Sequence, residues 1–461
     1  MSCDIAVIGL GTMGSNIARN FAHHNVQVAV YNRSYERTEA LLKFKDENVT
    51  PTKTIEELVG VLKAPRKILL MVTDGAVDAV VKPILPLLSK GDIIIDGGNS
   101  YWKNTERRQK EINPTGVIYV GMGISGGEEG ALNGPSMMFG GERSAWEACK
   151  PVLLPIAAKS AEGQPCVDYM GSGGAGHFVK MVHNAIEYAD MQLIAETYDI
   201  LTKLFKLDAG KIADIFGSWN KTVLKSYLIQ ITEAVLNHKE GDVPLVNLIL
   251  DRAAQKGTGK WAAQDSFDFA IPTPGFCEAV SARVVSFMKE ERVAASKVLN
   301  KKAISTADDL IKITVEDLEK GLYAAKIACY AQGFAMIQAA SIQNNYGVDI
   351  AACARVWRGG CIIRADFLND VAARYKADTK NLMMIDHFAQ ALESRLEGWR
   401  KVVALTALKG IPAPLFASTL AYFDSYSSEV LPANLLQGLR DYFGAHTYER
   451  VDKPGNFHTE W

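Results

Sequence analysis

The chain has 461 residues, of which 48% are hydrophobic and 22% are charged, and its formal net charge is −2. This length exceeds one average core and suits about two or three domains, and the composition is that of an ordinary soluble globular protein. The near-neutral charge excludes a nucleic-acid or membrane partner that is held by bulk charge.

Short β-branched runs alternate with helical patterns over the first 170 residues. The predicted strands are residues 5–8, 26–31, 68–72, 93–95 and 117–120, with helices such as 13–24 and 56–62 between them. This alternation is typical of a parallel sheet with helices on both faces. We therefore predict an α/β Rossmann-type domain over residues 1–175.

A glycine-rich turn follows the first predicted strand and opens the first predicted helix. Its residues are Gly9, Leu10, Gly11, Thr12, Met13 and Gly14. Glycines at this spacing allow a tight turn and a close approach of a pyrophosphate, which the helix N-terminus then faces. The spacing alone is a weak signal, but its place at the first strand favours a dinucleotide site over a turn without a ligand.

The second predicted strand ends in Asn32, Arg33 and Ser34. An acidic residue about 20 positions after the glycines would hold the ribose 2′-hydroxyl of NAD. Arg33 stands there instead, 19 residues after Gly14, and a guanidinium can bind a 2′-phosphate with a charge-assisted fork. We therefore predict NADP as the cofactor, since a merely exposed arginine would leave the missing acid unexplained.

Two glycine-rich segments lie further along the predicted sheet. Residues 96–100, which include Asn99, follow a strand at the edge where doubly wound folds bind ligands. Residues 121–141 carry eight glycines and include Ser125, Gly126 and Gly127. Such loops expose backbone amides that can bind a carboxylate or a phosphate, so together they favour a binding rim over separate ordinary turns.

An apolar helical pattern covers residues 176–205 and carries a polar stripe. Because positions three and four apart share a helical face, Lys180, His183, Asn184 and Glu187 form this stripe, with Tyr188 at its edge. A lysine, an imidazole, an amide and a carboxylate make a candidate acid–base set. The alternative is a solvated stripe on an amphipathic helix, which is the more common case.

Helical patterns continue to about residue 428 and contain a weak internal repeat. Residues 180–196 can be laid over residues 326–342, after which 207–208 align with 348–349 and 215–216 with 356–357. The alignment keeps the apolar positions in phase. The second copy lacks the polar stripe, whose positions hold Cys329, Tyr330 and Gly333. This loss favours a functional stripe, and we predict an all-α domain over residues 176–430.

Other basic residues lie far apart in the sequence. Lys256 and Thr258 belong to a segment that resembles an anion loop, although its spacing is not that of a P-loop, and Arg283 follows further on. Arg440 and His446 lie in a C-terminal tail, residues 431–461, that is rich in aromatic and charged residues and has little periodicity. Sequence alone does not bring these residues together.

Cysteine usage bears on location and metal binding. The seven cysteines are scattered, and no two of them form a CxxC pair. An odd number without such pairs argues against a disulfide framework or a zinc site and fits reduced thiols. The N-terminus enters a predicted strand at once, which is not the pattern of a signal peptide. We expect a cytoplasmic protein without a metal.

Together these motifs resemble those of the decarboxylating, NADP-dependent 6-phosphogluconate dehydrogenases of the pentose phosphate pathway. The resemblance covers essentially the whole chain and rests on residues 9–14, 32–34, 96–100, 125–130, 176–188, 256–261 and 440–446. It implies the oxidative decarboxylation of 6-phospho-D-gluconate to D-ribulose 5-phosphate and carbon dioxide, with reduction of NADP and without a metal.

The resemblance also implies roles for single residues. Lys180 resembles the general base of this family and Glu187 its general acid. The implied contacts to the sugar acid are Asn99, Ser125, Gly126, Gly127, His183 and Asn184, and the implied phosphate ligands are Tyr188, Lys256, Thr258 and Arg283. The implied contacts to NADP are residues 9–14, Asn32, Arg33, Ser34, Val72, Thr73, Asp74 and Asn99. In the implied homodimer, Arg440 and His446 of one tail would complete the site of the neighbouring subunit.

Two departures from the family pattern concern the cofactor. The family usually has Ala-Val within the fingerprint, where this chain has Gly11 and Thr12, and usually has Val-Lys-Ala-Gly where this chain has residues 72–75, Val-Thr-Asp-Gly. The absent lysine, with an acid beside Thr73, predicts weaker contacts to NADP there. Because Arg33 remains, the predicted preference for NADP stands.

Two rival functions remain open from the sequence. Enzymes of the wider β-hydroxyacid dehydrogenase group oxidise without decarboxylation and share the first domain and a lysine on the interdomain helix, but they are typically much shorter. A non-catalytic NADP-binding protein on the same scaffold would be expected to lose Lys180 or Glu187, and this chain keeps both.

Overall fold

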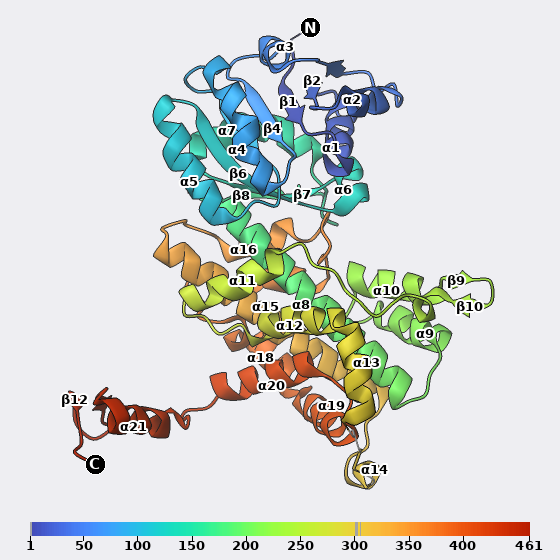
Figure 1. The fold of residues 1–461 in the computed structure, drawn as a ribbon, viewed down its shortest axis with the longest axis vertical. Coiled ribbons are helices and arrows are strands. Elements are labelled where there is room, and N and C mark those ends of the chain that lie inside the picture. The colour runs from blue at the N-terminus through green and yellow to red at the C-terminus, as the bar shows by residue number, and fades with distance from the viewer. Residues whose placement is uncertain (1, 300–302, 305) are drawn as a thin grey trace.

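A computed structural model describes residues 2–299, 303–304 and 306–461 of the chain. Met1 and residues 300–302 and 305, which belong to the first and second predicted domains, lie outside the described residues. A sheet-based part adjoins a larger helical body, and the C-terminal segment stands away from both (Figure 1). No helix of the described residues has the length and apolar character that crossing a membrane requires.

The N-terminal part is built on one eight-stranded sheet with the strand order β3-β2-β1-β4-β5-β6-β7-β8. Its strands are β1 (Ile5–Ile8), β2 (Val28–Tyr31), β3 (Val49–Pro51), β4 (Lys67–Leu70), β5 (Ile93–Asp96), β6 (Ile118–Ser125), β7 (Ser136–Gly140) and β8 (Val167–Gly171). Its helices are α1 (Thr12–His23), α2 (Tyr35–Leu42), α3 (Ile55–Gly60), α4 (Asp74–Ile84), α5 (Trp102–Ile112), α6 (Gly127–Asn133) and α7 (Arg143–Ile156). Side chains of β1 alternate between two buried clusters, so the sheet is covered on both faces as predicted.

The five predicted strands all pair in parallel, and beyond β6 the sheet continues into two strands that sequence reasoning missed. Strand β7 pairs antiparallel with β6, from Gly121 opposite Gly140 to Ser125 opposite Ser136, and β8 then runs parallel to β7. Only ten residues separate Ser125 from Ser136. A parallel neighbour needs a crossover of about a dozen residues or more, so this short connection returns the chain antiparallel.

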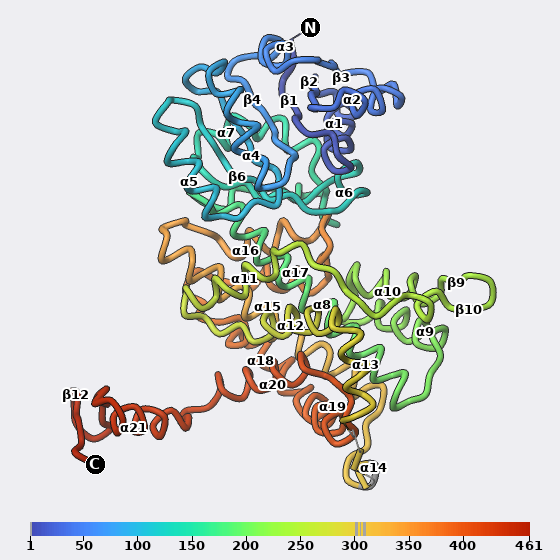
Figure 2. Tube along the Cα trace, in the orientation of Figure 1, coloured from blue at the N-terminus to red at the C-terminus, as the bar shows by residue number. Residues whose placement is uncertain are grey.

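The helical body begins with α8, which leaves the sheet part and passes through the body next to α15 (Figure 2). Its helices are α8 (Ala175–Lys203), α9 (Ala209–Trp219), α10 (Tyr227–Asn237), α11 (Thr258–Asp268), α12 (Pro274–Phe287), α13 (Lys289–Val298), α14 (Ala307–Leu310), α15 (Val315–Gln343), α16 (Ile350–Val356), α17 (Phe367–Arg374), α18 (Asp386–Glu393), α19 (Leu396–Lys409) and α20 (Pro414–Tyr426), with a small hairpin of β9 (Lys239–Glu240) and β10 (Val243–Pro244). The predicted helix over residues 176–205 thus matches α8 closely.

The internal repeat is visible in how the two halves fold. Helices α8 and α15 are both 29 residues long. The aligned residues Asp208 and Asp349 both cap the helix that follows, with side-chain oxygens that accept hydrogen bonds from backbone amides at 2.9 Å. The aligned rings of Phe216 and Trp357 are both fully buried. The repeated pattern therefore places equivalent caps and core residues in the two copies.

The tail forms a small folded unit of its own. It contains α21 (Ala433–Gly444) and a hairpin of β11 (Tyr448–Glu449) and β12 (Asn456–Phe457). The buried carboxylate of Asp441 accepts hydrogen bonds from the backbone amides of Thr447 and Thr459 and from the indole of Trp461. Sequence reasoning missed α21, whose leucines are exposed and do not follow the pattern of a helix packed on its own core.

Candidate active site

The fingerprint glycines build a tight turn that leaves the start of α1 open. Gly9 has φ of +97°, and a Cβ added to it would lie 2.6 Å from the Met71 carbonyl oxygen. A Cβ on Gly14 would lie 1.9 Å from the Gly9 carbonyl oxygen, whereas one on Gly11 would meet no atom within 4 Å. Gly9 and Gly14 are thus required by the turn, whereas the space beside Gly11 at the helix N-terminus is open, as a bound pyrophosphate would need.

Of the three residues after β2, Asn32 holds the turn, and Arg33 and Ser34 face solvent. The Asn32 side-chain oxygen accepts a hydrogen bond from the Leu10 amide at 2.9 Å, and its amide group donates to the Ser34 carbonyl oxygen at 2.9 Å. Arg33 and Ser34 are exposed beside this turn. Asn32 is therefore part of the scaffold, and Arg33 presents an exposed cation beside the turn, which fits the 2′-phosphate of NADP.

The polar stripe of α8 is buried, which makes the solvated alternative wrong. Lys180, His183 and Asn184 are all buried and Glu187 is half-buried. The Lys180 ammonium nitrogen lies 3.4 Å from His183 Nδ1, which lies 3.1 Å from Asn184 Oδ1. On its other side, His183 Nε2 lies 3.4 Å from the hydroxyl of Ser125 at the end of β6. The stripe thus meets the glycine-rich rim of the sheet.

Burial brings the three ionisable groups of the stripe towards their neutral forms. It lowers the pKa of Lys180 to about 8, although the negative charge of Glu187 opposes the shift. Burial likewise raises the pKa of Glu187, against the opposing charges of Lys180 and Arg283. It also lowers the pKa of His183 well below its usual range. A lysine with such a pKa can serve as a proton acceptor near neutral pH, which a free lysine cannot.

This shift predicts a pH dependence. We expect log kcat/KM to rise with unit slope as pH increases and to level off near the Lys180 pKa of about 8, because only neutral Lys180 accepts a proton. Steady-state rates from about pH 6 to 9.5 measure this, and a solvent-viscosity control separates chemistry from substrate association. A profile that is flat across that interval would contradict a titrating base.

Four predicted phosphate ligands converge from three segments of the chain. The Arg283 guanidinium lies 3.5 Å from the centre of the Tyr188 ring. The Lys256 amide donates to the Tyr188 hydroxyl at 3.4 Å, and Thr258 begins α11 directly after Gly257, which has φ of +94°. Gly259 allows α11 to pack closely on Tyr188, because a Cβ at this position would lie 2.6 Å from the Tyr188 ring. The tertiary structure therefore builds a cationic pocket edge beside Glu187.

Sequence reasoning missed one side of the candidate site, which Trp357 and the loop after α16 form in the second repeat. The Trp357 ring lies edge-on to His183, with centroids 5.6 Å apart. A Cβ on Gly126, which has φ of +125°, would lie 2.7 Å from the Gly360 carbonyl oxygen. The loop after α16 thus packs against both the rim and the stripe. The pair Gly359-Gly360 was a signal in the sequence that could have pointed to this close approach.

Comparison with known proteins decides the family. The model described as "NAD binding domain of 6-phosphogluconate dehydrogenase" matches residues 4–171, and "6-phosphogluconate dehydrogenase, C-terminal domain" matches residues 176–461. The chain belongs to the 6-phosphogluconate dehydrogenase family. This family assignment agrees with a fingerprint turn, a buried lysine and a cationic pocket edge in one molecule.

Full-length relatives support the assignment. The chain is 49% identical to the Bacillus subtilis "6-phosphogluconate dehydrogenase, NADP(+)-dependent, decarboxylating", over 99% of this chain and 98% of that protein. It is 46% identical to the decarboxylating 6-phosphogluconate dehydrogenase of Escherichia coli K12, with the same coverage. The solved 6-phosphogluconate dehydrogenase of Plasmodium falciparum superposes with a TM-score of 0.94 at 42% identity and covers all of both chains.

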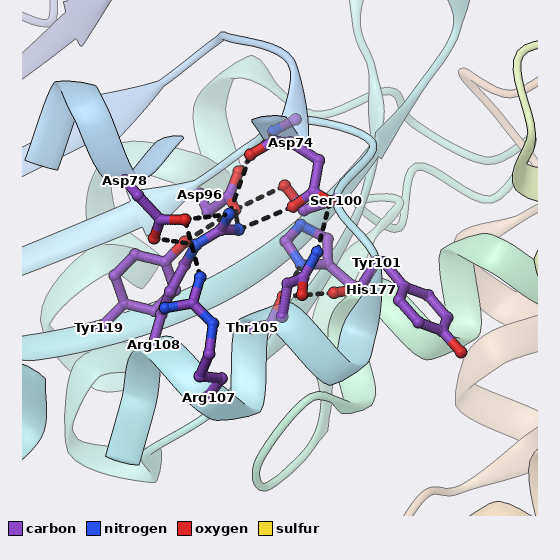
Figure 3. A network of polar contacts seen from close by, with 12 residues as sticks. Asp74, Asp78, Asp96, Ser100, Tyr101, Thr105, Arg107, Arg108, Tyr119 and His177 are labelled. Atoms are coloured by element: carbon purple, nitrogen blue, oxygen red, sulfur yellow. Dashed lines mark hydrogen bonds and ion pairs between the residues drawn. The ribbon is translucent and has the colours of Figure 1, made fainter. Parts of the chain in front are cut away.

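One departure from the 6-phosphogluconate dehydrogenase pattern has a structural explanation. Thr73 precedes the first residue of α4, and Asp74 turns towards α5. Its carboxylate accepts hydrogen bonds from Asn104 at 2.6 Å and from Arg108 at 2.8 Å (Figure 3). The acid beside Thr73 is therefore paired with a cation of the same chain. Asn99 is exposed on the neighbouring loop after β5.

The structure does not bring the two predicted tail residues to this site. Arg440 lies on α21 and hydrogen-bonds Gln437, and the His446 ring packs edge-on against Phe443. Both residues are exposed, and α21 stands away from the body of its own subunit (Figure 1). Their role in a 6-phosphogluconate dehydrogenase site stays a prediction.

Proposed function

We propose that the chain catalyses the oxidative decarboxylation of 6-phospho-D-gluconate to D-ribulose 5-phosphate and carbon dioxide, with reduction of NADP to NADPH. The observation that carries this proposal is the buried pair Lys180 and Glu187, which lies between the rim of the sheet and the cationic pocket edge. The B. subtilis relative is described as NADP-dependent and decarboxylating, and the P. falciparum structure was solved with NADP+ and with 6-phosphogluconate. This reaction belongs to the oxidative branch of the pentose phosphate pathway.

The substrate carries a carboxylate at one end and a phosphate at the other. We assign the phosphate to the pocket edge formed by Tyr188, Lys256, Thr258 and Arg283, where a cation and a helix N-terminus converge. The sugar acid then lies along the stripe, in reach of His183, Asn184 and the rim residues Ser125, Gly126 and Gly127. Asn99 completes the rim on the cofactor side.

Lys180 is the base in the oxidation. NADP, when bound, accepts the hydride from C3 of the sugar acid. Neutral Lys180 takes the proton of the C3 hydroxyl as that hydride leaves, and the resulting ammonium then donates a hydrogen bond to the new C3 carbonyl oxygen. The bond between C1 and C2 breaks, carbon dioxide leaves, and the electron pair of that bond forms an enediolate. The enediolate becomes the enediol when its C3 oxygen takes a proton from the Lys180 ammonium.

Glu187 is the acid that completes the reaction. It protonates the former C2 carbon of the enediol, which is C1 of ribulose 5-phosphate, while the enediol hydroxyl returns its proton to Lys180. Lys180 and Glu187 must afterwards exchange protonation states before the next turnover. Burial moves the pKa of Lys180 down and that of Glu187 up, and each charge acts on the other, so the pair titrates as a coupled unit.

Arg33 gives a prediction for cofactor choice. We expect Arg33→Ala to raise the KM for NADP about tenfold or more and to change the KM for NAD by less than about twofold, because only NADP carries the 2′-phosphate. Arg143→Ala is a matched control, since Arg143 is also exposed and its guanidinium lies over the Tyr169 ring of β8, far from β2 in the strand order of the sheet. Initial rates with both cofactors measure the effect, and an equal rise for both would show that Arg33 does not read the phosphate.

We also propose a homodimer in which each tail completes the neighbouring site. The apolar side chains of α21 are each more than half exposed, namely Leu435, Leu436, Leu439, Tyr442 and Phe443. A second exposed apolar set lies on α12 and α13 and includes Val284, Phe287 and Val293. Apolar surface of this extent suits a second copy of the chain. The tail, which contains Arg440 and His446, stands away from the body of its own chain (Figure 1). Seven free cysteines support the proposed cytoplasmic location.

An assay of the purified protein tests the proposed function. With 6-phosphogluconate we expect reduction of NADP to be fast and that of NAD to be much slower, and unphosphorylated gluconate should be a poor substrate because it leaves the cationic pocket edge unused. NADP binding without turnover would instead support a non-catalytic protein. Efficient oxidation of short β-hydroxyacids would support the wider dehydrogenase group.

A further inference from the structure

A buried arginine lies beneath the two loops on the cofactor side of the sheet. The Arg108 side chain is 2% exposed, although it belongs to the surface helix α5. Its guanidinium donates to the Asp74 carboxylate at 2.8 Å, to the Asp74 backbone carbonyl at 2.9 Å and to the Asp78 carboxylate at 2.9 Å. It lies 3.6 Å from the Asp96 carboxylate (Figure 3). One side chain thus binds the start of α4 and the end of β5.

The second loop is ordered by Asp96, the fully buried carboxylate next to Arg108. It accepts hydrogen bonds from the Gly98 amide at 3.1 Å, the Ser100 hydroxyl at 2.7 Å and the Tyr119 hydroxyl at 2.8 Å. These contacts flank Asn99, whose side chain is exposed. The orientation of Asn99 therefore depends on Asp96.

The two loops also touch directly. A Cβ on Gly98 would lie 2.4 Å from the Val72 carbonyl oxygen, so the loop after β5 rests on the loop after β4 without a side chain between them. Any displacement of Asp74 would therefore be transmitted to the segment around Asn99. Packed backbone of this kind transmits small shifts because it has little free volume.

The charges around Arg108 make it difficult to replace. Asp74, Asp78 and Asp96 surround it, and among the residues that the structure describes only Asp78 forms an ion pair with a second cation, the more exposed Arg107. Without Arg108, the Asp74 carboxylate would add a negative charge beside the loop that faces an anionic cofactor, and Asp96 would remain as a buried charge without a cation. Removing one member of a buried charged group is strongly unfavourable.

We propose that Arg108 is a positioning residue for the cofactor and for Asn99. It joins the loops after β4 and β5 into one unit and neutralises Asp74, and it touches neither substrate nor cofactor itself. The inference rests on the proposed function because it takes NADP as the ligand of this edge. Arg108, a residue outside the stripe, thereby contributes to NADP affinity and to the alignment of the cofactor for hydride transfer.

The test compares three substitutions by calorimetric titration of NADP in the absence of substrate. Arg108→Met is expected to weaken NADP binding by about tenfold to a hundredfold, since misplacement of a site by about 1 Å has effects of that order. Arg108→Lys should recover part of the affinity, because it restores the charge but not the fork. Arg107→Met is the matched control and should bind NADP normally, since Arg107 reaches Asp78 but not the loops.

A charge suppressor separates positioning from general destabilisation. Asp74→Asn should restore about a third or more of the affinity that Arg108→Met loses, because it removes the unpaired charge. Denaturant unfolding of each variant then shows whether NADP affinity changes without a matching change in stability. If Arg108→Met does not fold, Arg108→Lys alone and combined with Asp74→Asn provide the same comparison. Normal NADP affinity in the Arg108 variants, or a loss that Asp74→Asn leaves unchanged, would overturn the inference. Wild-type turnover of 6-phosphogluconate is measured alongside, and its absence would overturn the proposed function separately.

Discussion

The Lys180→Met protein is expected to bind NADP normally and to reduce it at least about a thousandfold more slowly than the wild type, because removal of a general base usually costs about 10²–10⁴-fold and here the same group also polarises the carbonyl. NADPH formation under saturating substrate measures the rate, and calorimetric titration measures the affinity. The long apolar side chain of methionine fills the space of the lysine stem. The loss would therefore report the missing amine and not a cavity.

The same substitution is expected to stabilise the protein. Burial lowers the Lys180 pKa from 10.5 to about 8, so between these values the unfolded chain binds more protons and stability rises with pH. Below about pH 8 the free-energy cost of burying the charged ammonium is fully present. Lys180→Met should remove this cost, which is up to about 3 kcal/mol. Denaturant unfolding at pH 7 and pH 10 should show the gain shrinking at the higher pH.

The internal repeat supplies a matched control for this prediction. Lys326 occupies the position in α15 that corresponds to Lys180 in α8, and its ammonium is paired with the buried Asp190 carboxylate at 2.6 Å. Lys326→Met leaves that carboxylate unpaired and should destabilise the protein by about 3–5 kcal/mol while folded protein retains turnover. If Lys180→Met kept near-normal activity, or if both lysine variants were equally inactive when folded, the assigned base would be wrong.

Heterodimers with substitutions on opposite chains are expected to regain about half of the wild-type activity, if each tail completes the neighbouring site of a twofold dimer. One chain carries Lys180→Met, and the other carries Arg440→Ala and His446→Ala. Each variant alone should be severely impaired, the tail variant by about tenfold to a hundredfold because it loses charged contacts. In the heterodimer, one site combines an intact body with an intact tail, and the other site lacks both.

Placing all substitutions on one chain reverses the expectation. A heterodimer of that chain with the wild type has no site with both an intact body and an intact tail, so its activity should fall to that of the single variants. The two heterodimers can be purified by distinct affinity tags on the two chains. Activity in the second heterodimer and none in the first would show that each tail serves its own chain.

Local sequence patterns predicted the elements that carry their own signals. The bounds of α8 and β1, the fingerprint turn and the matched helix starts at Asp208 and Asp349 all follow from glycine placement, capping residues and apolar periodicity. A functional stripe was inferred from its loss in the second copy, and the structure shows that the stripe is largely buried. These features depend on residues close together in the chain.

The features that were missed depend on contacts between distant residues. Helix α21 has exposed leucines and no core within its own subunit, so its pattern is not that of a buried helix. The antiparallel β7 follows from a connection length that was not weighed. The pairing of Asp74 with Arg108 spans 34 residues, and nothing in the sequence tells which of several nearby basic residues an acid will meet. The side of the site at Trp357 and Gly360 likewise arises only when the second repeat packs against the first.

The most direct test of the proposed reaction uses 6-phosphogluconate labelled with ¹³C at C1 and follows where the label goes. With wild-type protein and NADP, we expect one labelled carbon dioxide for each NADPH formed, and unlabelled ribulose 5-phosphate as the product. The Lys180→Met protein should release neither. NADPH formation without labelled carbon dioxide would contradict the account, because it would make the chain a dehydrogenase that retains the carboxylate.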